Sequence, residues 1–445
     1  MARKVLYVCH NHPRVRAGGA ETYAHELHLA MRSQPVWEPT FLAKSGPPLS
    51  RSGRTHEGAY VSPVDGADAE YFLYADGYDF DWLYGTMRHS KELYTRHLRE
   101  FLLALEPDVV HFQHTLFIGY DAIRETRRTL PGVPIVYTLH EFLPICHNKG
   151  QMVRTMDGEL CAEESPRRCS ECFPEFSPPT FLLRKRFIQA QLGLVDLFVA
   201  PSAMLLERFV EWGLPRERIL LEEYGRRAPV GGPAPERSPP HDRLGFFGQL
   251  NPYKGIDVLL AAMAELAGDA SPAAARDRGD GAEARLTRPQ LRVHGANLDL
   301  QEHGFRDRVG QLLAQAGDHV SSLGAYGPKQ LDELMAAVDW VVVPSTWWEN
   351  SPLVIQEAFA HGRPVICSDI GGMAEKVAHE RNGLHFRSGD ARSLAATIRR
   401  AVETPGLWEH LRAGIPPVHS LDEHVAVLAN AYERLIEQRR AELAA

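Results

Sequence analysis

The chain has 445 residues, more than one hydrophobic core usually organises, so two domains are expected. Its composition, 44% hydrophobic and 24% charged, is that of a globular protein. Because 49 basic and 57 acidic residues leave a formal net charge of −8, a general nucleic-acid binder is disfavoured. The opening apolar run is too short for a signal peptide, and no segment is apolar enough to span a bilayer, which predicts a cytoplasmic location.

Short apolar strands alternate with amphipathic helices along the first half of the chain, a pattern typical of parallel α/β layers. Strands are predicted at residues 5–9, 109–112, 135–138, 197–200 and 219–221. Helices are predicted at residues 20–31, 120–129, 181–194 and 203–212. The segment 47–85, rich in Gly, Asp and Tyr, is expected to be irregular, and the first domain to span residues 1–225.

The composition changes after residue 225. Residues 226–241 hold so much proline and glycine that neither helix nor strand should persist, so 226–243 is interpreted as a linker. A second domain, 244–420, has strands predicted at 244–247, 291–294, 340–343 and 365–367 and an insertion, 268–289, that is expected to be disordered. A final helix in 421–445 is expected to cross back to the first domain. The predicted fold class is α/β, with two Rossmann-like domains facing across a cleft and ligands at the carboxyl ends of the strands.

The strongest functional pattern follows the strand at 340–343. It places Glu349 in a loop and Glu357 in the first turns of a helix whose mouth is marked by Pro352. Two such carboxylates can hydrogen-bond separate hydroxyls of one polyhydroxylated ligand, while amides at the helix start hold its phosphate. In the structural alternative, Glu349 is a solvated loop residue and Glu357 only offsets the helix dipole.

A second pattern, FFGQLNPYKGI at residues 246–256, ends a strand at Gly248 and opens a helix near Gly255. Lys254 at the mouth of that helix is placed to neutralise a diphosphate leaving group, although a lone loop lysine is more often only solvated. Gln249 in the same loop can donate a hydrogen bond.

The Glu-x7-Glu spacing after a strand and the following AHGRPVICSDIGGMAE resemble the retaining GT-B glycosyltransferases of family 4, the group 1 glycosyl transferases. The resemblance implies transfer of a sugar, with retention, from a UDP-, GDP- or ADP-linked donor to a hydroxyl of a glycan, lipid-linked or small-molecule acceptor. Glu349 would then contact the donor sugar and Glu357 the ribose, with no catalytic metal. Gln249 stands where the family usually has arginine, which leaves Lys254 as the main phosphate anchor. The further residues implied at the donor are Gly18, Gly19, Gly248, Gly295, Tyr326, Asn350, Ser351, Pro352 and Leu353.

Gly18 and Gly19 open a helix after the first predicted strand. A glycine loop at a helix start can lie close to a phosphate or sugar, but two glycines alone often mark only a turn. Because the loop lacks a spaced G-x-G-x-x-G, a nicotinamide enzyme is disfavoured.

His140 follows the strand at 135–138, and the resemblance places it near the donor sugar. His140, Lys254 and Glu349 are therefore the predicted catalytic residues. The alternative for His140 is a structural histidine satisfied by a backbone carbonyl. His111 and His114 are ranked lower because alternation along their strand should bury one of them.

Four of the six cysteines lie in one polar stretch, at positions Cys146, Cys161, Cys169 and Cys172. A C-x2-C pair with two further thiols in a reducing compartment suits a structural zinc ion, which would hold a loop of little apolar content. The spacing is irregular, so an iron–sulfur cluster and reduced thiols are the alternatives. The resemblance is thus to members with a cysteine-rich loop, here residues 146–172. Cys9 and Cys367 lie in apolar strands and are expected in the core.

Other functions compete with sugar transfer. A GT-B-fold sugar-nucleotide epimerase or glycoside phosphorylase could use the same two domains, and a non-catalytic scaffold is the third interpretation. Asp79-Phe80-Asp81 is similar to a metal-binding D-x-D, but its aromatic setting favours a chance match. Peripheral contact with the inner face of the membrane is a further hypothesis, based on FLLRKR at residues 181–186 and the basic stretch 88–99.

Overall fold

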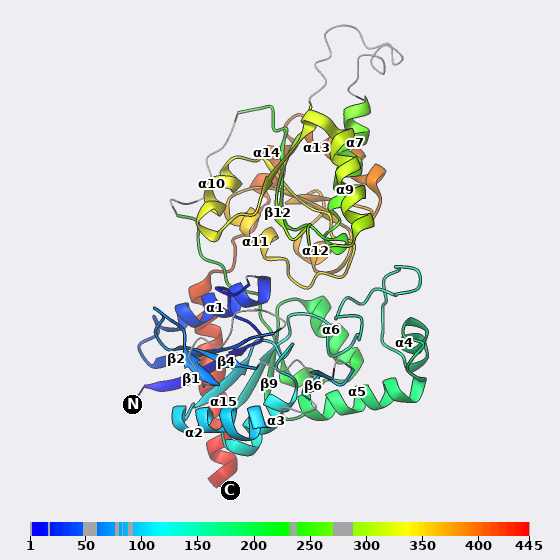
Figure 1. Cartoon of the computed structure of the whole chain (residues 1–445). Coiled ribbons are helices and arrows are strands. Elements are labelled where there is room, and N and C mark those ends of the chain that lie inside the picture. Colours follow the sequence, from blue (N-terminus) through cyan, green and yellow to red (C-terminus); the bar gives the residue numbers. More distant parts are fainter. Residues whose placement is uncertain are drawn as a thin grey trace, which may run out of the picture. The chain divides into compact units, whose positions relative to one another are not determined.

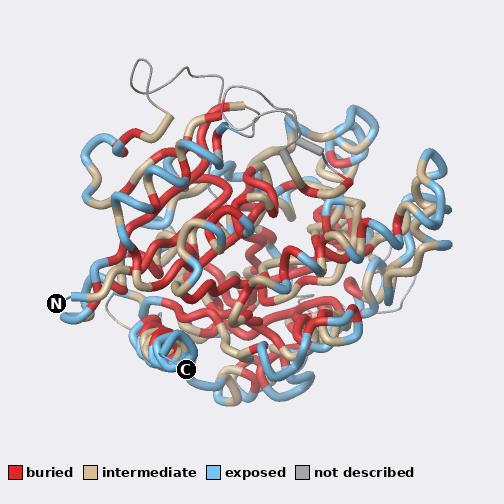
Figure 2. Tube along the Cα trace, turned by 90° about the horizontal axis from the view of Figure 1, so that it is seen from below, coloured by how far each residue is buried: buried red, intermediate tan, exposed pale blue. Residues whose placement is uncertain are grey.

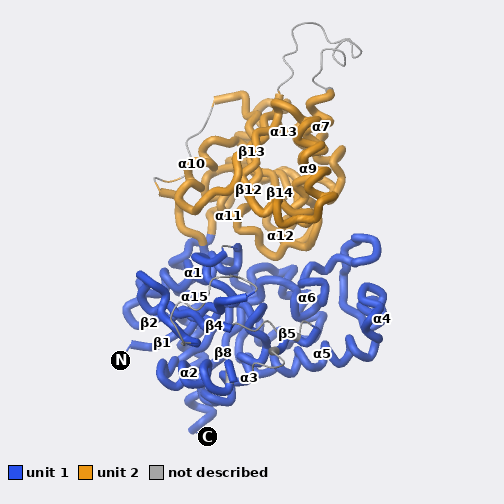
Figure 3. The backbone as a smooth tube through the Cα atoms, viewed as in Figure 1, with its two compact units in different colours: residues 1–225, 419–445 blue, residues 226–418 orange. Residues whose placement is uncertain are grey.

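The computed structural model describes residues 2–16, 18–47, 60–75, 80–81, 83–87, 92–230, 232, 238–269 and 288–444 (Figure 1). Buried residues are concentrated in the strands and on the inner faces of the helices (Figure 2). The chain divides into two compact units (Figure 3), unit 1 with residues 1–225 and 419–445 and unit 2 with residues 226–418. Asp79 and nearly all of the predicted insertion 268–289 lie outside the described residues.

Unit 1 is built on an eight-stranded sheet with the order β10-β9-β8-β7-β1-β2-β4-β3, in which every described pair except β3 with β4 is parallel. The five predicted strands are confirmed as β1 (Arg3–Cys9), β7 (Val109–Phe112), β8 (Ile135–Thr138), β9 (Leu197–Ala200) and β10 (Ile219–Leu221). Their continuous apolar runs reflect a parallel sheet that is buried on both faces.

The interpretation of residues 47–85 as irregular is wrong for residues 61–63 and 70–74, while 48–59, 76–79 and residue 82 lie outside the described residues. This segment holds β3 (Val61–Pro63) and β4 (Glu70–Tyr74), which extend the sheet beyond β2 (Trp37–Ser45). Pro39 and Lys44 interrupt the apolar pattern of β2, so its pairing with β1 rather than its own sequence identifies it as a strand.

The four predicted helices of unit 1 are confirmed as α1 (Gly19–Met31), α3 (Asp121–Thr129), α5 (Pro178–Leu192) and α6 (Ala203–Trp212). Helix α5 begins earlier than predicted, at Pro178, because proline at the first helical position has no N–H that needs a partner. Two shorter helices, α2 (Arg99–Leu105) and α4 (Pro166–Cys172), were not predicted.

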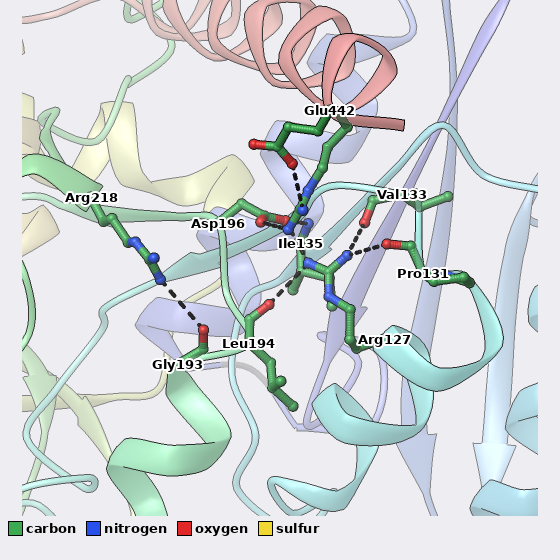
Figure 4. A network of polar contacts seen from close by, with 10 residues as sticks. Arg127, Pro131, Val133, Ile135, Gly193, Leu194, Asp196, Arg218 and Glu442 are labelled. Atoms are coloured by element: carbon green, nitrogen blue, oxygen red, sulfur yellow. Dashed lines mark hydrogen bonds and ion pairs between the residues drawn. The ribbon is translucent and has the colours of Figure 1, made fainter. Parts of the chain in front are cut away.

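Helix α15 (Leu421–Ala444), the last helix of the chain, belongs to unit 1 and packs beside α1. An ion-pair network fastens it to the sheet: Asp196 accepts from Arg127 at 2.6 Å and from the Ile135 amide at 2.7 Å, and it is paired with Arg439 of α15 (Figure 4). This network lies at the amino ends of β8 and β9, opposite to the end at which a parallel sheet binds ligands.

Unit 2 has a six-stranded parallel sheet with the order β13-β12-β11-β14-β15-β16. The four predicted strands are confirmed as β11 (Arg243–Gln249), β12 (Gln290–Ala296), β14 (Trp340–Val343) and β15 (Val365–Ser368). The outer strands β13 (Val320–Gly324) and β16 (Gly383–Phe386) were not predicted, since β13 is largely exposed and lacks an apolar run. The helices are α7 (Ile256–Asp269), α9 (His303–Ala316), α10 (Leu331–Ala336), α11 (Leu353–Ala360), α12 (Gly371–Lys376), α13 (Ala391–Glu403) and α14 (Leu407–Ala413).

The strand order of unit 2 reverses between β11 and β14. The chain starts at β11, runs outward through β12 and β13, and then returns to β14 on the other side of β11. Successive residues of β14 face two hydrophobic clusters, with Trp340 and Val342 in one and Val341 and Val343 in the other. Ligands of open α/β sheets bind where the strand order reverses. A ligand site is therefore expected at the carboxyl ends of β11 and β14.

Acid is expected to destabilise unit 1 through His111, which is fully buried in β7. Burial, with a smaller effect of His424, lowers the pKa of His111 from 6.5 to about 3. The unfolded chain therefore takes up a proton that the folded state excludes, and stability falls as the pH drops below the unfolded pKa. Between about pH 8 and about pH 5 this costs about 2 kcal/mol of unfolding free energy.

Urea titrations of the wild type and His111→Asn across this pH range check the prediction. The variant starts from a lower stability, because bonds to Tyr432 and Thr138 are changed, but its pH dependence should be shallower. Equal pH dependence of the two proteins would contradict the assignment.

Candidate functional site

Glu349 lies in the loop between β14 and α11 and is only 5% exposed. Its Oε1 accepts hydrogen bonds from Lys254 Nζ at 2.6 Å, Ser345 Oγ at 2.7 Å and Trp347 Nε1 at 3.0 Å. Within the described part of the chain, these side-chain bonds all end on Oε1, so Oε2 can accept from a ligand. Glu349 is thus a buried, oriented carboxylate and not a solvated loop residue.

Lys254 comes from the loop after β11, the neighbouring strand. It ends a short 3-10 turn that begins with Asn251, whose side chain accepts from the Lys254 amide at 3.0 Å. Gly255 follows with φ at +64°, and a Cβ there would lie 1.9 Å from Pro344 O. Only glycine allows this approach, which brings the loops after β11 and β14 together and places Lys254 against Glu349.

A glycine pair after β15 fixes the backbone of the same loop. The Gly372 amide donates to Glu349 O at 2.6 Å, and a Cβ on Gly372 would lie 2.0 Å from Asn350 O. The predicted start of helix α11 is confirmed, with Pro352 as N-cap and Leu353 as the first residue, and no side chain caps it. The Ser351 amide is turned toward the Asn350 side chain. Amides at such a helix start can hold a phosphate.

Glu357 is held by an arginine that sequence reasoning missed. Arg226, at the start of unit 2, places Nη2 2.5 Å from Glu357 Oε1. Burial, and next the Glu357 charge, raise the pKa of Tyr326, which packs edge-on to His294 and Phe247. Arg226 lay in the segment interpreted as linker, where proline and glycine obscured it.

Three other predicted donor residues lie at the ends of β11 and β12. Gly248 and Gly295 are register partners, and a Cβ on Gly295 would lie 2.6 Å from Gly248 O. Gln249 is exposed, and its Oε1 accepts from Asn251 at 3.3 Å. The structure therefore brings the predicted residues of unit 2 to one end of one sheet.

Three histidines follow neighbouring strands of unit 1: His10 after β1, His114 after β7 and His140 after β8. Ring centroids are 4.5 Å apart for His10 and His114 and 6.4 Å apart for His114 and His140. Burial, and next the charge of His114, lower the pKa of both His10 and His140, so these rings are neutral near pH 7. His10 was not predicted, although its place one residue beyond a predicted strand was a usable signal.

His140 is held from two sides. Its Nδ1 lies 2.7 Å from Tyr224 OH, and its Nε2 lies 3.2 Å from Gln113 Oε1. Because an amide oxygen only accepts, Nε2 carries the proton and Nδ1 accepts from the tyrosine. His111, by contrast, lies within the sheet, where it contacts Tyr432 and Thr138.

Helix α1 begins at Gly19 with Gly18 as N-cap. Burial would raise the pKa of Glu21 in the first turn, but the hydrogen bond from His10, at 3.0 Å, is the main cause that brings it down to about 2. A Cβ on Gly18 would lie 2.5 Å from Glu21 Oε2, whereas nothing lies within 4 Å of one on Gly19. The Glu21 carboxylate thus fills the space beside Gly18 at the start of α1. The space beside Gly19 is open to a ligand.

The four cysteines predicted to hold zinc form no disulfide and are partly buried. Burial raises the pKa of Cys146 to about 11 and that of Cys169 to about 12, with smaller contributions from neighbouring thiols. Two groups of three potential metal ligands lie within 4.8 Å of one another in the described residues, and neither includes these thiols. As arranged, the thiols do not form a tetrahedral site, and zinc at this loop stays a prediction.

The segment on which the membrane hypothesis rests is only partly exposed, since Leu182 and Leu183 are exposed but two of its other residues are buried, and membrane contact stays a prediction. Phe181 is 2% and Arg184 4% exposed, and Arg184 donates to the carbonyl oxygens of Leu83 and Leu143, each at 2.8 Å. Part of the basic stretch 88–99 lies outside the described residues. None of the helices in the described ranges is long and apolar enough to cross a membrane.

Two parallel α/β units, each with polar side chains gathered at the carboxyl ends of its strands, define the class that contains the GT-B glycosyltransferases. Residues 17–221 match the family Glycosyltransferase Family 4, and residues 241–404 match Glycosyl transferases group 1. Together the two matches cover most of both units. The chain therefore belongs to the family 4, group 1 glycosyl transferases.

Individual relatives are distant. A D-inositol 3-phosphate glycosyltransferase from Nocardioides is 27% identical over 327 residues, which are 69% of this chain and only 62% of that relative. Anabaena HepE in complex with UDP and glucose has a TM-score of 0.62 at 18% identity, covering 97% of this chain and all of HepE. Sucrose-phosphate synthase from Thermosynechococcus elongatus has a TM-score of 0.67 at 17% identity, covering 98% of this chain and 100% of that one. These similarities confirm the GT-B fold.

Proposed function

We propose that the protein is a retaining glycosyltransferase that moves a sugar from a nucleoside diphosphate to a hydroxyl acceptor. The observation that carries the proposal is the Lys254–Glu349 pair at 2.6 Å, at the carboxyl ends of β11 and β14. A cation beside an oriented carboxylate suits the two parts of such a donor, since Lys254 can meet the diphosphate and Glu349 Oε2 the sugar hydroxyls. A relative named for glycosyl transfer and HepE structures with UDP and UDP-glucose support this.

The remaining donor contacts follow from the positions of the side chains in unit 2. We assign the uncapped first turn of α11 to the phosphates, Glu357 to the ribose hydroxyls and Tyr326 to the base. Gly248 leaves space at the end of β11 through which a ligand can approach the backbone, because a Cβ there would have no neighbour closer than 3.8 Å, whereas the space beside Gly295 is filled by Gly248 O and the Leu250 side chain.

In the proposed reaction, the acceptor oxygen bonds to the anomeric carbon while the bond from that carbon to the phosphate oxygen breaks on the same face. The acceptor proton passes to the leaving phosphate. Lys254 and the α11 amides stabilise the charge that develops on that phosphate, and no catalytic metal is required. We assign the neutral His140, oriented by Tyr224 and Gln113, to the reacting sugar.

The proposal is tested by incubating the protein with labelled UDP-, GDP- and ADP-sugars and an acceptor series that includes inositol phosphates. We expect label in a glycoside whose anomeric configuration, read by NMR, matches the donor. An epimerised nucleotide sugar without transfer would favour the epimerase, and sugar phosphate formed from inorganic phosphate would favour the phosphorylase. An inverted product would refute retention, and no reaction with any donor would refute the transferase.

Removing Arg226 is expected to raise KM for the donor by about tenfold with little change in kcat. Arg226 does not itself meet the reacting atoms, but it orients Glu357, so its loss should weaken ribose binding equally in ground and transition states. Steady-state kinetics of Arg226→Ala check this, with the exposed Arg227→Ala as matched control. A fall in kcat at unchanged KM would contradict the assignment.

A further inference from the structure

Two distant segments of unit 1 meet where the chain leaves this unit and returns to it. Glu222 follows β10 and is anchored to the sheet, because its amide donates to Ala200 O at 2.9 Å. The returning chain starts at His419, and His424 lies in the first turn of α15. A Cβ on Gly225 would lie 2.6 Å from His424 Cβ and 2.7 Å from Leu421 Cα, so the two segments are in close contact.

At this contact, one carboxylate oxygen lies between two imidazoles. Glu222 Oε1 is 2.8 Å from His419 Nε2 and 2.8 Å from His424 Nδ1. The three atoms lie within 4.8 Å of one another. The His424 side chain is fully buried, whereas that of His419 is 27% exposed, which gives the cluster one side that faces solvent.

His419 Nε2 and His424 Nδ1 face Glu222 and are called the inner nitrogens, and the other nitrogen of each ring is its outer nitrogen. The contacts of the outer nitrogens allow both inner nitrogens to bind a cation. The outer nitrogen of His424, Nε2, lies 2.7 Å from Tyr23 OH, which can accept a proton as well as donate one. The outer nitrogen of His419, Nδ1, lies 3.7 Å from Glu423 Oε2, which can only accept. In the metal-free cluster His419 Nε2 can donate to Glu222, and when its proton moves to Nδ1 the lone pair left on Nε2 can bind a cation that it shares with the carboxylate. At 3.7 Å Glu423 is an ion-pair neighbour of His419 and not a hydrogen-bond partner, but a carboxylate is the kind of group to which metal-bound histidines donate their second N–H.

The other compact group, His12, His25 and Glu70, lacks this property. His12 Nδ1 accepts from the Arg14 amide at 3.1 Å, so its Nε2 must carry the proton that it donates to Glu70. A metal ion bound at Nε2 would displace this proton to Nδ1. Nδ1 could then no longer accept from the Arg14 amide, so the bond to Arg14 would be lost. This group therefore serves as an internal control.

We propose that Glu222, His419 and His424 form a two-histidine, one-carboxylate site for a divalent transition metal of the zinc class, with water at the exposed side. Metal–ligand distances of about 2.0–2.2 Å require only a small opening of the present cluster. The ion would fasten the first turn of α15 to the chain that leaves β10, a structural role independent of sugar transfer.

The test uses the full-length protein, stripped with a chelator and titrated with Zn²⁺ by calorimetry and with Co²⁺ by absorption. We expect one equivalent to bind without the charge-transfer absorption that thiolate ligands give, which separates this site from the cysteine loop. Glu222→Gln and His419→Ala should each weaken this equivalent by about a hundredfold, and zinc should raise the melting temperature of the wild type but not of these variants.

His25→Ala is the matched control and should bind zinc as the wild type does. His419 is partly exposed, so its variant keeps the test valid if Glu222→Gln fails to fold. Zinc binding that is unchanged in His419→Ala, or no binding outside the cysteine loop, would overturn the proposal.

Discussion

Replacing Glu349 by glutamine is expected to lower kcat/KM for sugar transfer by about a thousandfold. The amide oxygen can take the place of Oε1 and keep the bonds from Ser345 and Trp347. The amide nitrogen then replaces Oε2 and cannot accept from a sugar hydroxyl. The negative charge beside Lys254 is lost as well, so both the sugar contact and the placement of the lysine suffer.

The measurement is steady-state kinetics with the preferred donor, together with the melting temperature to show that the variant is folded. Glu403→Gln is the matched control, because this carboxylate is exposed at the end of α13 of the same unit. If Glu349→Gln retained activity within about threefold of the wild type, Glu349 could not be a catalytic residue.

Replacing Arg184 by methionine is expected to lower the free energy of unfolding by about 3–5 kcal/mol. The guanidinium is buried and donates to carbonyl oxygens of Leu83 at 2.8 Å, Leu143 at 2.8 Å and Pro144 at 2.9 Å. Methionine fills part of the volume but leaves these buried oxygens without their donor. Lysine should not rescue the loss, because one ammonium group cannot reproduce the planar set of donors.

Urea unfolding followed by circular dichroism measures this effect. Arg186→Met on the exposed side of α5 is the control and should change stability by less than about 0.5 kcal/mol. Because Leu143 and Pro144 lie shortly after His140, a folded Arg184 variant should also lose activity through misplacement of that histidine. A loss of less than about 1 kcal/mol in the free energy of unfolding would contradict the assignment of Arg184 as the buried donor that stabilises these carbonyl oxygens.

The sequence predicted those parts of the fold whose signal is local. Central strands such as β7 and β14 are buried on both faces and carry unbroken apolar runs, so their bounds were correct to the residue. Strands β2 and β4 were not recognised because they become strands by pairing with β1 and with each other, and the exposed β13 has no hydrophobic pattern. Such edge elements depend on tertiary contacts.

The candidate site shows the same division. Glu349 and Lys254 were found because each follows a predicted strand, but their mutual bond joins residues 95 positions apart and no local pattern shows it. The partnership of Arg226 with Glu357 spans 131 positions and was equally hidden. The inward direction of Arg184 went unrecognised because a helix with charges and apolar residues on several faces gives no clear buried side.

Nucleotide binding by the Lys254–Glu349 site is the central claim, and calorimetric titration with UDP, GDP and ADP tests it most directly. We expect one of the three to bind the wild type, and Lys254→Ala to weaken that binding by at least about tenfold through loss of the charge near the phosphates. Lys329→Ala, which removes an exposed lysine of the same unit, should leave binding unchanged. Equal affinities of Lys254→Ala and the wild type, or no binding of any of the three, would contradict a donor site at the ends of β11 and β14.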